Sequence, residues 1–94
     1  MLRITENFEN GKTVRLRLDG SVSNDTLTDL NQAISHNRNG AGRIVMLDMA
    51  GVEFVTDHAA RELVKLRGDN LRIINCSPFI ATLLENIAER ETRQ

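Results

Sequence analysis

Thr56, Asp57 and His58 follow one another in the chain and offer a hydroxyl, a carboxylate and an imidazole. A hydroxyl and an imidazole can each accept a phosphoryl group, so the three residues could form a phosphorylation or phosphocarrier site. They also stand where a helix is predicted to begin, and either Thr56 or Asp57 can cap its free backbone N–H groups. From the residues alone, helix capping is the simpler interpretation for Thr56 and Asp57, and a solvated side chain is the simpler one for His58.

Other residues that could do chemistry lack the spacing that chemistry requires. His36, His58 and Cys76 show neither His-x-x-x-His nor Cys-x-x-Cys spacing, so no metal site is predicted. The stretch 40–42 is Gly-Ala-Gly, but no Lys-Ser or Lys-Thr follows it, and a strand rather than a helix comes next. No Ser/His/Asp or Cys/His order is visible either. We therefore expect neither an enzyme nor a bound cofactor.

The element that positions the candidate site is the segment from Ile44 to Leu66. Residues 44–47 form a continuous aliphatic run of strand length, which is typical of a strand covered on both faces near the centre of a sheet. The run ends at Asp48, passes through Gly51, and is followed by apolar residues at helical spacing, namely Ala60, Leu63 and Val64. This pattern predicts a buried strand, a tight connection and a helix.

The remaining apolar periods predict three more strands and two more helices. Alternation indicates strands near 2–8 and 14–18, joined by a two-residue turn at Asn10-Gly11 into an antiparallel hairpin that ends at residues 19–21. A helix is expected up to about His36, then a mobile loop over 37–42, a strand over 71–75, and a helix that Ser77 caps and Pro78 begins. The last residues, 89–94, are polar and are expected to fray.

This order, β-β-α-β-α-β-α, predicts an α/β fold with a small mixed four-stranded sheet in one domain spanning residues 1–94. Right-handed crossovers put the first two helices on the same face of the sheet. The other face is then uncovered, and strand alternation places either Ile44 and Met46 or Val45 and Leu47 on it. We expect such an apolar patch to seat a partner or a second copy of the chain.

Composition restricts the class of partner. The formal net charge is −1, and three Phe with no Tyr or Trp provide few stacking surfaces, so a nucleic acid partner is not expected. Cys76 is the single cysteine, which fits a reducing compartment, and the first ten residues lack an apolar signal core. No run reaches membrane-spanning length. Cytoplasmic residence is therefore expected.

The pattern strand-Leu-Asp-x-x-Gly-Val-x-Phe-Val, followed at once by a helix, resembles the core of STAS domains, the fold of anti-sigma-factor antagonists. The matching residues are Leu47, Asp48, Gly51, Val52, Phe54 and Val55. In that family the next residues are typically Asp-Ser-Ser-Gly-Leu, and a partner kinase phosphorylates the first Ser, which is Thr in some members. Here residues 56–60 read Thr-Asp-His-Ala-Ala, so no serine stands at the position that the resemblance marks as the phosphoacceptor.

Two alignments with the family are open. Without a gap, Thr56 replaces the family Asp, Asp57 the phosphoacceptor, His58 the second Ser and Ala59 the Gly. A one-residue insertion would instead put His58 at the acceptor position. The ungapped alignment is preferred because it keeps the flanking apolar residues in register, namely Phe54, Val55, Ala60, Leu63 and Val64.

The resemblance also indicates a second loop. Gly20-Ser21-Val22-Ser23 occupies the family's Gly-x-Leu-Asp turn, where an acid commonly stands near the acceptor serine. Ser23 replaces that acid in this chain, and helix capping is the simpler role for it.

By resemblance, the chain is expected to be a non-enzymatic module that binds another protein, such as a kinase-like anti-sigma factor, with a degenerate phosphorylation site. Partner switching in signal transduction and transcription regulation would be its context. The first alternative is an accessory subunit of a membrane transport system, such as a lipid-transport ATPase. A phosphocarrier that uses His58 is the second alternative, and no other residue supports it.

Overall fold

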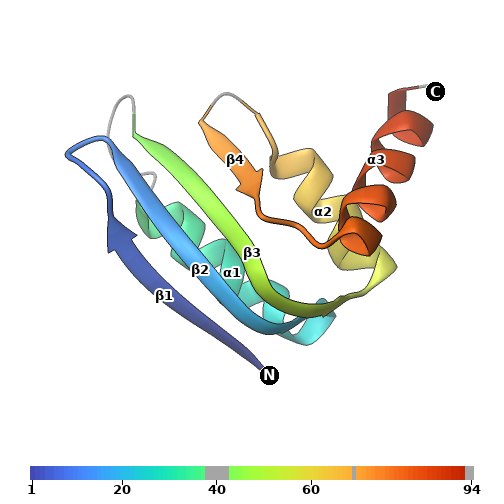
Figure 1. The fold of residues 1–94 in the computed structure, drawn as a ribbon, viewed down its shortest axis with the longest axis horizontal. Coiled ribbons are helices and arrows are strands. Elements are labelled where there is room, and N and C mark those ends of the chain that lie inside the picture. The colour runs from blue at the N-terminus through green and yellow to red at the C-terminus, as the bar shows by residue number, and fades with distance from the viewer. Residues whose placement is uncertain (38–42, 69, 93–94) are drawn as a thin grey trace.

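The computed structural model describes residues 1–37, 43–68 and 70–92. Seven elements follow one another in the order expected from the sequence (Figure 1). They are β1 (Leu2–Phe8), β2 (Thr13–Val22), α1 (Asn24–Asn37), β3 (Ile44–Val55), α2 (Asp57–Leu66), β4 (Leu71–Ile74) and α3 (Pro78–Thr92).

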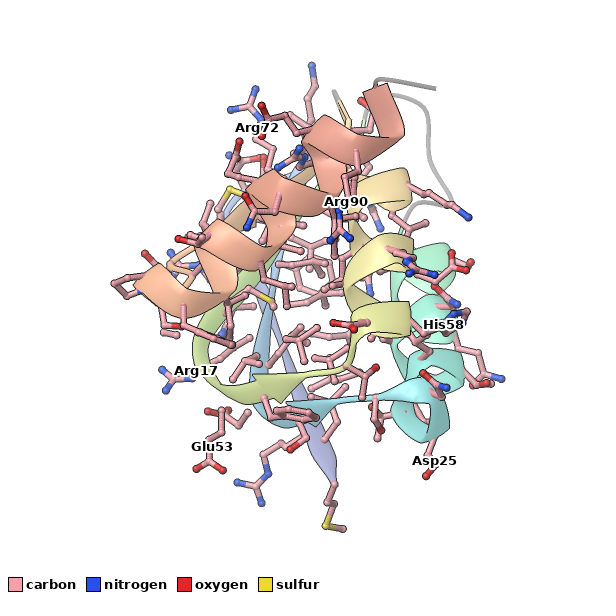
Figure 2. The ribbon with its side chains drawn as sticks, turned by 90° about the vertical axis from the view of Figure 1, so that its right-hand side faces the viewer. Arg17, Asp25, Glu53, His58, Arg72 and Arg90 are labelled. Atoms are coloured by element: carbon pink, nitrogen blue, oxygen red, sulfur yellow. The ribbon has the colours of Figure 1, made fainter. Side chains whose placement is uncertain are left out.

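The four strands form one mixed sheet in the order β1-β2-β3-β4. β1 is antiparallel to β2, whereas β2, β3 and β4 are parallel to one another. Each parallel step carries one crossover helix, and α1 and α2 lie on the same side of the sheet (Figure 2). α3 packs against α2. The predicted fold class and the central position of residues 44–47 are both confirmed.

The hydrophobic core lies between the sheet and its helices, as strand alternation predicts. Val14, Leu16 and Leu18 of β2 have no exposed surface, and neither do Val45 and Leu47 of β3. On the helical side the buried residues recur at helical spacing, namely Leu27, Leu30, Ile34, Ala59, Ala60, Leu63, Ile80, Leu84 and Ile87.

Two strands are longer than predicted. β3 does not stop at Asp48 but continues through Gly51 to Val55, and β2 continues through Gly20 to Val22. The register between them shifts twice, between Arg17 and Asp19 and again between Gly20 and Ser21. Extra residues on β3 are thus accommodated as bulges, which bend a strand without ending it.

Two predicted loops also differ. The β1–β2 connection is longer than a two-residue turn, because the Asn10 side chain accepts hydrogen bonds from the backbone N–H groups of Lys12 at 2.8 Å and Thr13 at 3.0 Å. Asn37, expected in a loop, is instead a buried residue of α1 whose amide donates to Glu6 and to the Ala33 carbonyl. The rest of that expected mobile loop, 38–42, lies outside the described residues.

The start of α3 agrees with prediction. The Ser77 hydroxyl accepts from the Ile80 N–H at 3.3 Å, and Pro78 is the first helical residue. The helix continues to Thr92, so residues 89–92, which were expected to fray, are helical. Residues 93–94 lie outside the description.

The uncovered face of the sheet carries Ile44 and Met46, while Val45 and Leu47 face the helices. Ile44 and Met46 are only half-buried. Register places Arg15 beside Met46 on β2 and Arg72 beside it on β4. The predicted apolar pair is therefore present, but it lies between arginines, so this face is mixed rather than an apolar patch.

Candidate functional site

The candidate site lies where β2 and β3 end side by side. The Thr56 backbone N–H donates to the Val22 carbonyl at 3.0 Å, which joins the residue after β3 to the last residue of β2. α1 starts at Asn24 and α2 at Asp57, so both helices begin at this end of the sheet (Figure 1). In open sheets of this kind, ligands and partners bind beyond the carboxyl ends of parallel strands.

Thr56 caps α2. Its hydroxyl accepts from the Ala59 N–H at 3.2 Å, and its backbone is extended, with φ −72° and ψ 159°. The same hydroxyl donates to the Asn24 side-chain oxygen at 3.3 Å. Thr56 therefore joins the two predicted loops directly, and its hydroxyl is engaged both as donor and as acceptor.

Replacing Thr56 by alanine is expected to lower the free energy of unfolding by about 1 kcal/mol, because one free N–H of α2 loses its acceptor. Urea denaturation of the purified protein measures this change. Thr56→Ser keeps the hydroxyl and is the matched control, so it should recover most of the loss. Equal stability of the wild type and Thr56→Ala would contradict the capping role.

The next three residues have different surroundings. Asp57, in the first turn of α2, and His58 are exposed, and His58 Nε2 lies 3.9 Å from Glu62 Oε1 one helical turn later. Figure 2 shows His58 on the outer side of the molecule, away from the sheet. Ala59 has no exposed surface and belongs to the core. Asp57 and His58 can therefore meet a partner, whereas Ala59 acts through packing.

The second predicted loop is largely strand. Gly20 and Ser21 belong to β2, and the Ser21 N–H donates to the Met1 carbonyl at 3.2 Å. Gly20 has a φ of +112°, and a Cβ at this position would lie 2.2 Å from the Met1 carbonyl oxygen. Glycine is thus required here both by backbone conformation and by the close approach of the N-terminus.

Ser23 precedes α1, but its hydroxyl accepts no backbone hydrogen bond at the helix start among those described. Its carbonyl accepts from the Leu27 N–H, and its own N–H donates to the Thr26 hydroxyl at 2.9 Å. Thr26 also donates to the Ser21 carbonyl at 3.1 Å. The side chain that bonds the backbone at the start of α1 is therefore that of Thr26. The sequence did not mark Thr26 as a site residue.

Two further residues at this end were missed as site residues. Asn24 receives the Thr56 hydroxyl, and Phe54, used above only as a marker of the resemblance, is 55% exposed in register with Ser21. The sequence did contain a signal for Phe54, because it stands directly before Val55 and so breaks the alternation of apolar and polar residues that Val52 and Glu53 begin. Its neighbour in the chain, Glu53, is also exposed and lies at this end of the molecule (Figure 2).

Neither a metal centre nor a membrane span was found within residues 1–37, 43–68 and 70–92. No three His, Cys, Asp or Glu side chains in this part of the chain come together to hold an ion. In the same ranges, no helix has both the length and the apolar character needed to cross a bilayer.

Comparison with known proteins identifies the fold. No protein-family profile and no curated protein matches the sequence. Among solved structures, the chain is similar to the anti-sigma factor antagonist SpoIIAA in its unphosphorylated form, with a TM-score of 0.63 and 16% identity over 97% of this chain and 98% of that one. An uncharacterised DUF3478-family protein with a SpoIIAA-like fold, from Shewanella loihica PV-4, matches with a TM-score of 0.43 and 10% identity over 88% of this chain and 93% of that chain.

The chain therefore has the STAS-like fold of SpoIIAA, as its central sequence pattern predicted. At 16% identity this similarity concerns the fold, and function has to be argued from the site itself.

Proposed function

We propose that this chain is a non-enzymatic protein-interaction module of the anti-sigma-factor-antagonist type, forming one domain over residues 1–94, with a degenerate phosphorylation site at the start of α2. The partner is another protein rather than a nucleic acid, and the module works in the cytoplasm without a cofactor. The fold shared with SpoIIAA supports this proposal, because SpoIIAA is an anti-sigma factor antagonist.

The observation that carries the proposal is the state of the first residues of α2. Asp57 offers an exposed carboxylate at the position that the ungapped alignment gives to the phosphoacceptor. The hydroxyl of the preceding residue, Thr56, is engaged with Ala59 and Asn24. A fixed negative charge thus replaces a hydroxyl that could be switched by phosphorylation.

The surface that would meet the partner combines both loops. Asp57 and His58 project from the start of α2, and Phe54 provides the apolar area beside Ser21. An exposed aromatic side chain within a polar rim is the arrangement that protein interfaces favour. Gly20 and Ser23 shape this surface through the backbone.

Capture of partners from the native cytoplasm tests this proposal. A tagged chain is expected to retain a kinase-like anti-sigma factor, and Phe54→Ala should weaken binding of the purified partner about fivefold, since an exposed anchor is removed. Phe8→Ala is the matched control, because Phe8 is also exposed but pairs with Val14 near the start of β2, whereas Phe54 pairs with Ser21 near its end.

Two results would contradict the proposal. Recovery of a membrane-transport component in place of an anti-sigma factor would favour the accessory-subunit alternative. Equal binding by the wild type and Phe54→Ala would show that these loops do not form the interface with the partner.

A further inference from the structure

β1 is an unpaired sheet edge with few features that discourage pairing. It bonds to β2 on one side, over seven residues and without a register shift. Its sequence, LRITENF, contains neither proline nor lysine, and its one inward-facing charge, on Glu6, is bonded to Asn37 of α1. The other edge strand, β4, has only four residues. β1 is therefore the edge that can accept another strand.

Two hydrogen bonds fix which backbone groups of β1 face outward. The Ser21 N–H donates to the Met1 carbonyl, and the Glu9 N–H donates to the Thr13 carbonyl. In an antiparallel ladder these bonds flank the pairs Leu2–Gly20 and Phe8–Val14, which are therefore non-hydrogen-bonded pairs. By alternation, Leu2, Ile4, Glu6 and Phe8 direct their N–H and C=O groups away from β2.

We infer that β1 pairs with β1 of a second copy of this chain, antiparallel and related by a two-fold axis at Thr5. In this register Leu2 stands opposite Phe8 of the second copy and Ile4 stands opposite Glu6, so all four outward residues are hydrogen-bonded. Thr5 stands opposite its own counterpart. The two sheets then become one continuous sheet of eight strands.

Side chains favour the same register. Phe8 is 64% exposed and lies on the helix side of β1, where Leu2 is half-buried against the core. Pairing sets Phe8 of each copy against Leu2 of the other and covers both. A register centred on Glu6 would bring two like charges together, and one centred on Ile4 would leave Phe8 without a partner.

The proposed β1–β1 pairing places no like charges opposite each other. Arg3 stands opposite Asn7 of the second copy, so no two arginines face each other. The Glu6 carboxylate is already bonded to Asn37, which keeps it beside α1. The paired edge lies away from the start of α2, so dimerisation and capture of another protein are separate events and can be tested separately.

A cysteine scan tests the register in a Cys76→Ser background. Thr5→Cys is expected to form a disulfide-linked dimer under mild oxidation, because opposite residues of a non-hydrogen-bonded pair lie about 4.5 Å apart at Cα. Arg3→Cys and Asn7→Cys alone should not, since each is four residues, about 14 Å, from its own counterpart. Mixing these two variants should restore the crosslink. Equal crosslinking of all single variants would overturn the register.

A second pair of variants tests the backbone contact by analytical ultracentrifugation over a range of concentrations. Glu6→Pro removes an outward N–H that β2 does not use, so it should keep the fold and abolish the dimer. Glu6→Ala loses the same bond to Asn37 but keeps the N–H, and should dimerise. Phe8→Ala should weaken the dimer about tenfold. A wild-type chain that is monomeric at its highest soluble concentration would overturn the proposal and leave this edge to a strand of another protein.

Discussion

Replacing Asp48 by alanine is expected to lower the free energy of unfolding by about 2 kcal/mol, because it removes a buried acceptor from two part-buried hydrogen bonds. Asp48 is only 4% exposed, although it lies on the sheet face that the helices leave uncovered. Its carboxylate accepts from the Ala50 N–H at 3.0 Å and from the Asn75 amide at 3.1 Å. Arg15 lies 3.8 Å away and adds a weaker, partly solvated attraction.

These contacts connect distant parts of the chain. Asn75 follows β4 with a φ of +59° and leads into the turn before α3. Ala50 belongs to the bulged part of β3. Asp48 thus holds the bulge and the β4–α3 turn in one place, and its loss should loosen both.

Acid should weaken the same contacts. Burial alone would raise the pKa of Asp48, but hydrogen bonds from Ala50 and Asn75 and the charges of Arg15 and Arg17 outweigh it, so the pKa lies below its ordinary value of 3.8. A lowered pKa in the folded state stabilises the fold above the ordinary pKa, and this contribution is lost as the pH falls through the lowered value.

Urea denaturation at pH 7 and near pH 3 measures both effects. Asp48→Asn keeps an acceptor oxygen without the charge, so it should be more stable than Asp48→Ala. The stability difference between the wild type and Asp48→Asn should shrink at the lower pH. A difference that is the same at both pH values would contradict the role assigned to the charge.

Most of the fold could be predicted because hydrophobic period and turn chemistry agree along the chain. The alternation of apolar and polar residues in β2 and the continuous aliphatic run at 44–47 predicted two strands. The Ser77-Pro78 pair predicted the start of α3. The extension of β2 and β3 could not be predicted locally. A glycine within a strand suggests a turn, and only the register between the two strands shows that Gly20 and Gly51 lie inside them.

The contacts of the site were harder to predict because they join residues far apart in the sequence. Thr56 meets Asn24, 32 residues away along the chain, only because β2 and β3 end side by side. Asn37 is buried because Glu6, 31 residues away, accepts its amide hydrogen. The residue types of Thr56 and Asp57 predicted a helix cap and a negative charge. A local pattern, however, cannot predict a hydrogen-bond partner that is distant in the sequence, such as Asn24.

Replacing Asp57 by serine or alanine is expected to strengthen binding to a kinase-type anti-sigma factor about tenfold or more, which corresponds to about 1.4 kcal/mol. The expectation rests on the proposed function and on what the STAS resemblance implies, namely that the phosphorylated form generally releases the anti-sigma partner. A carboxylate carries one charge where phosphoserine carries nearly two and three acceptor oxygens, so Asp57 should imitate that form only in part.

Asp25 provides a matched control for this change. It is an exposed acid in the first turn of α1, as Asp57 is in the first turn of α2, so Asp25→Ser removes the same charge and a similar dipole interaction. Calorimetric titration with the purified partner should show tighter binding for Asp57→Ser and unchanged binding for Asp25→Ser. If both variants bind alike, net charge rather than the position of Asp57 controls the affinity.

Mass spectrometry of the protein from its native host completes the test. The loss of a phosphorylation switch predicts an unmodified chain, whereas Asp57→Ser should become phosphorylated when the partner kinase and ATP are present. Stoichiometric phosphate on Thr56 would refute the lost switch, because the hydroxyl would then have to leave both Asn24 and the Ala59 N–H. Phosphate on His58 would instead support a phosphocarrier, since that imidazole is exposed and can meet a donor protein.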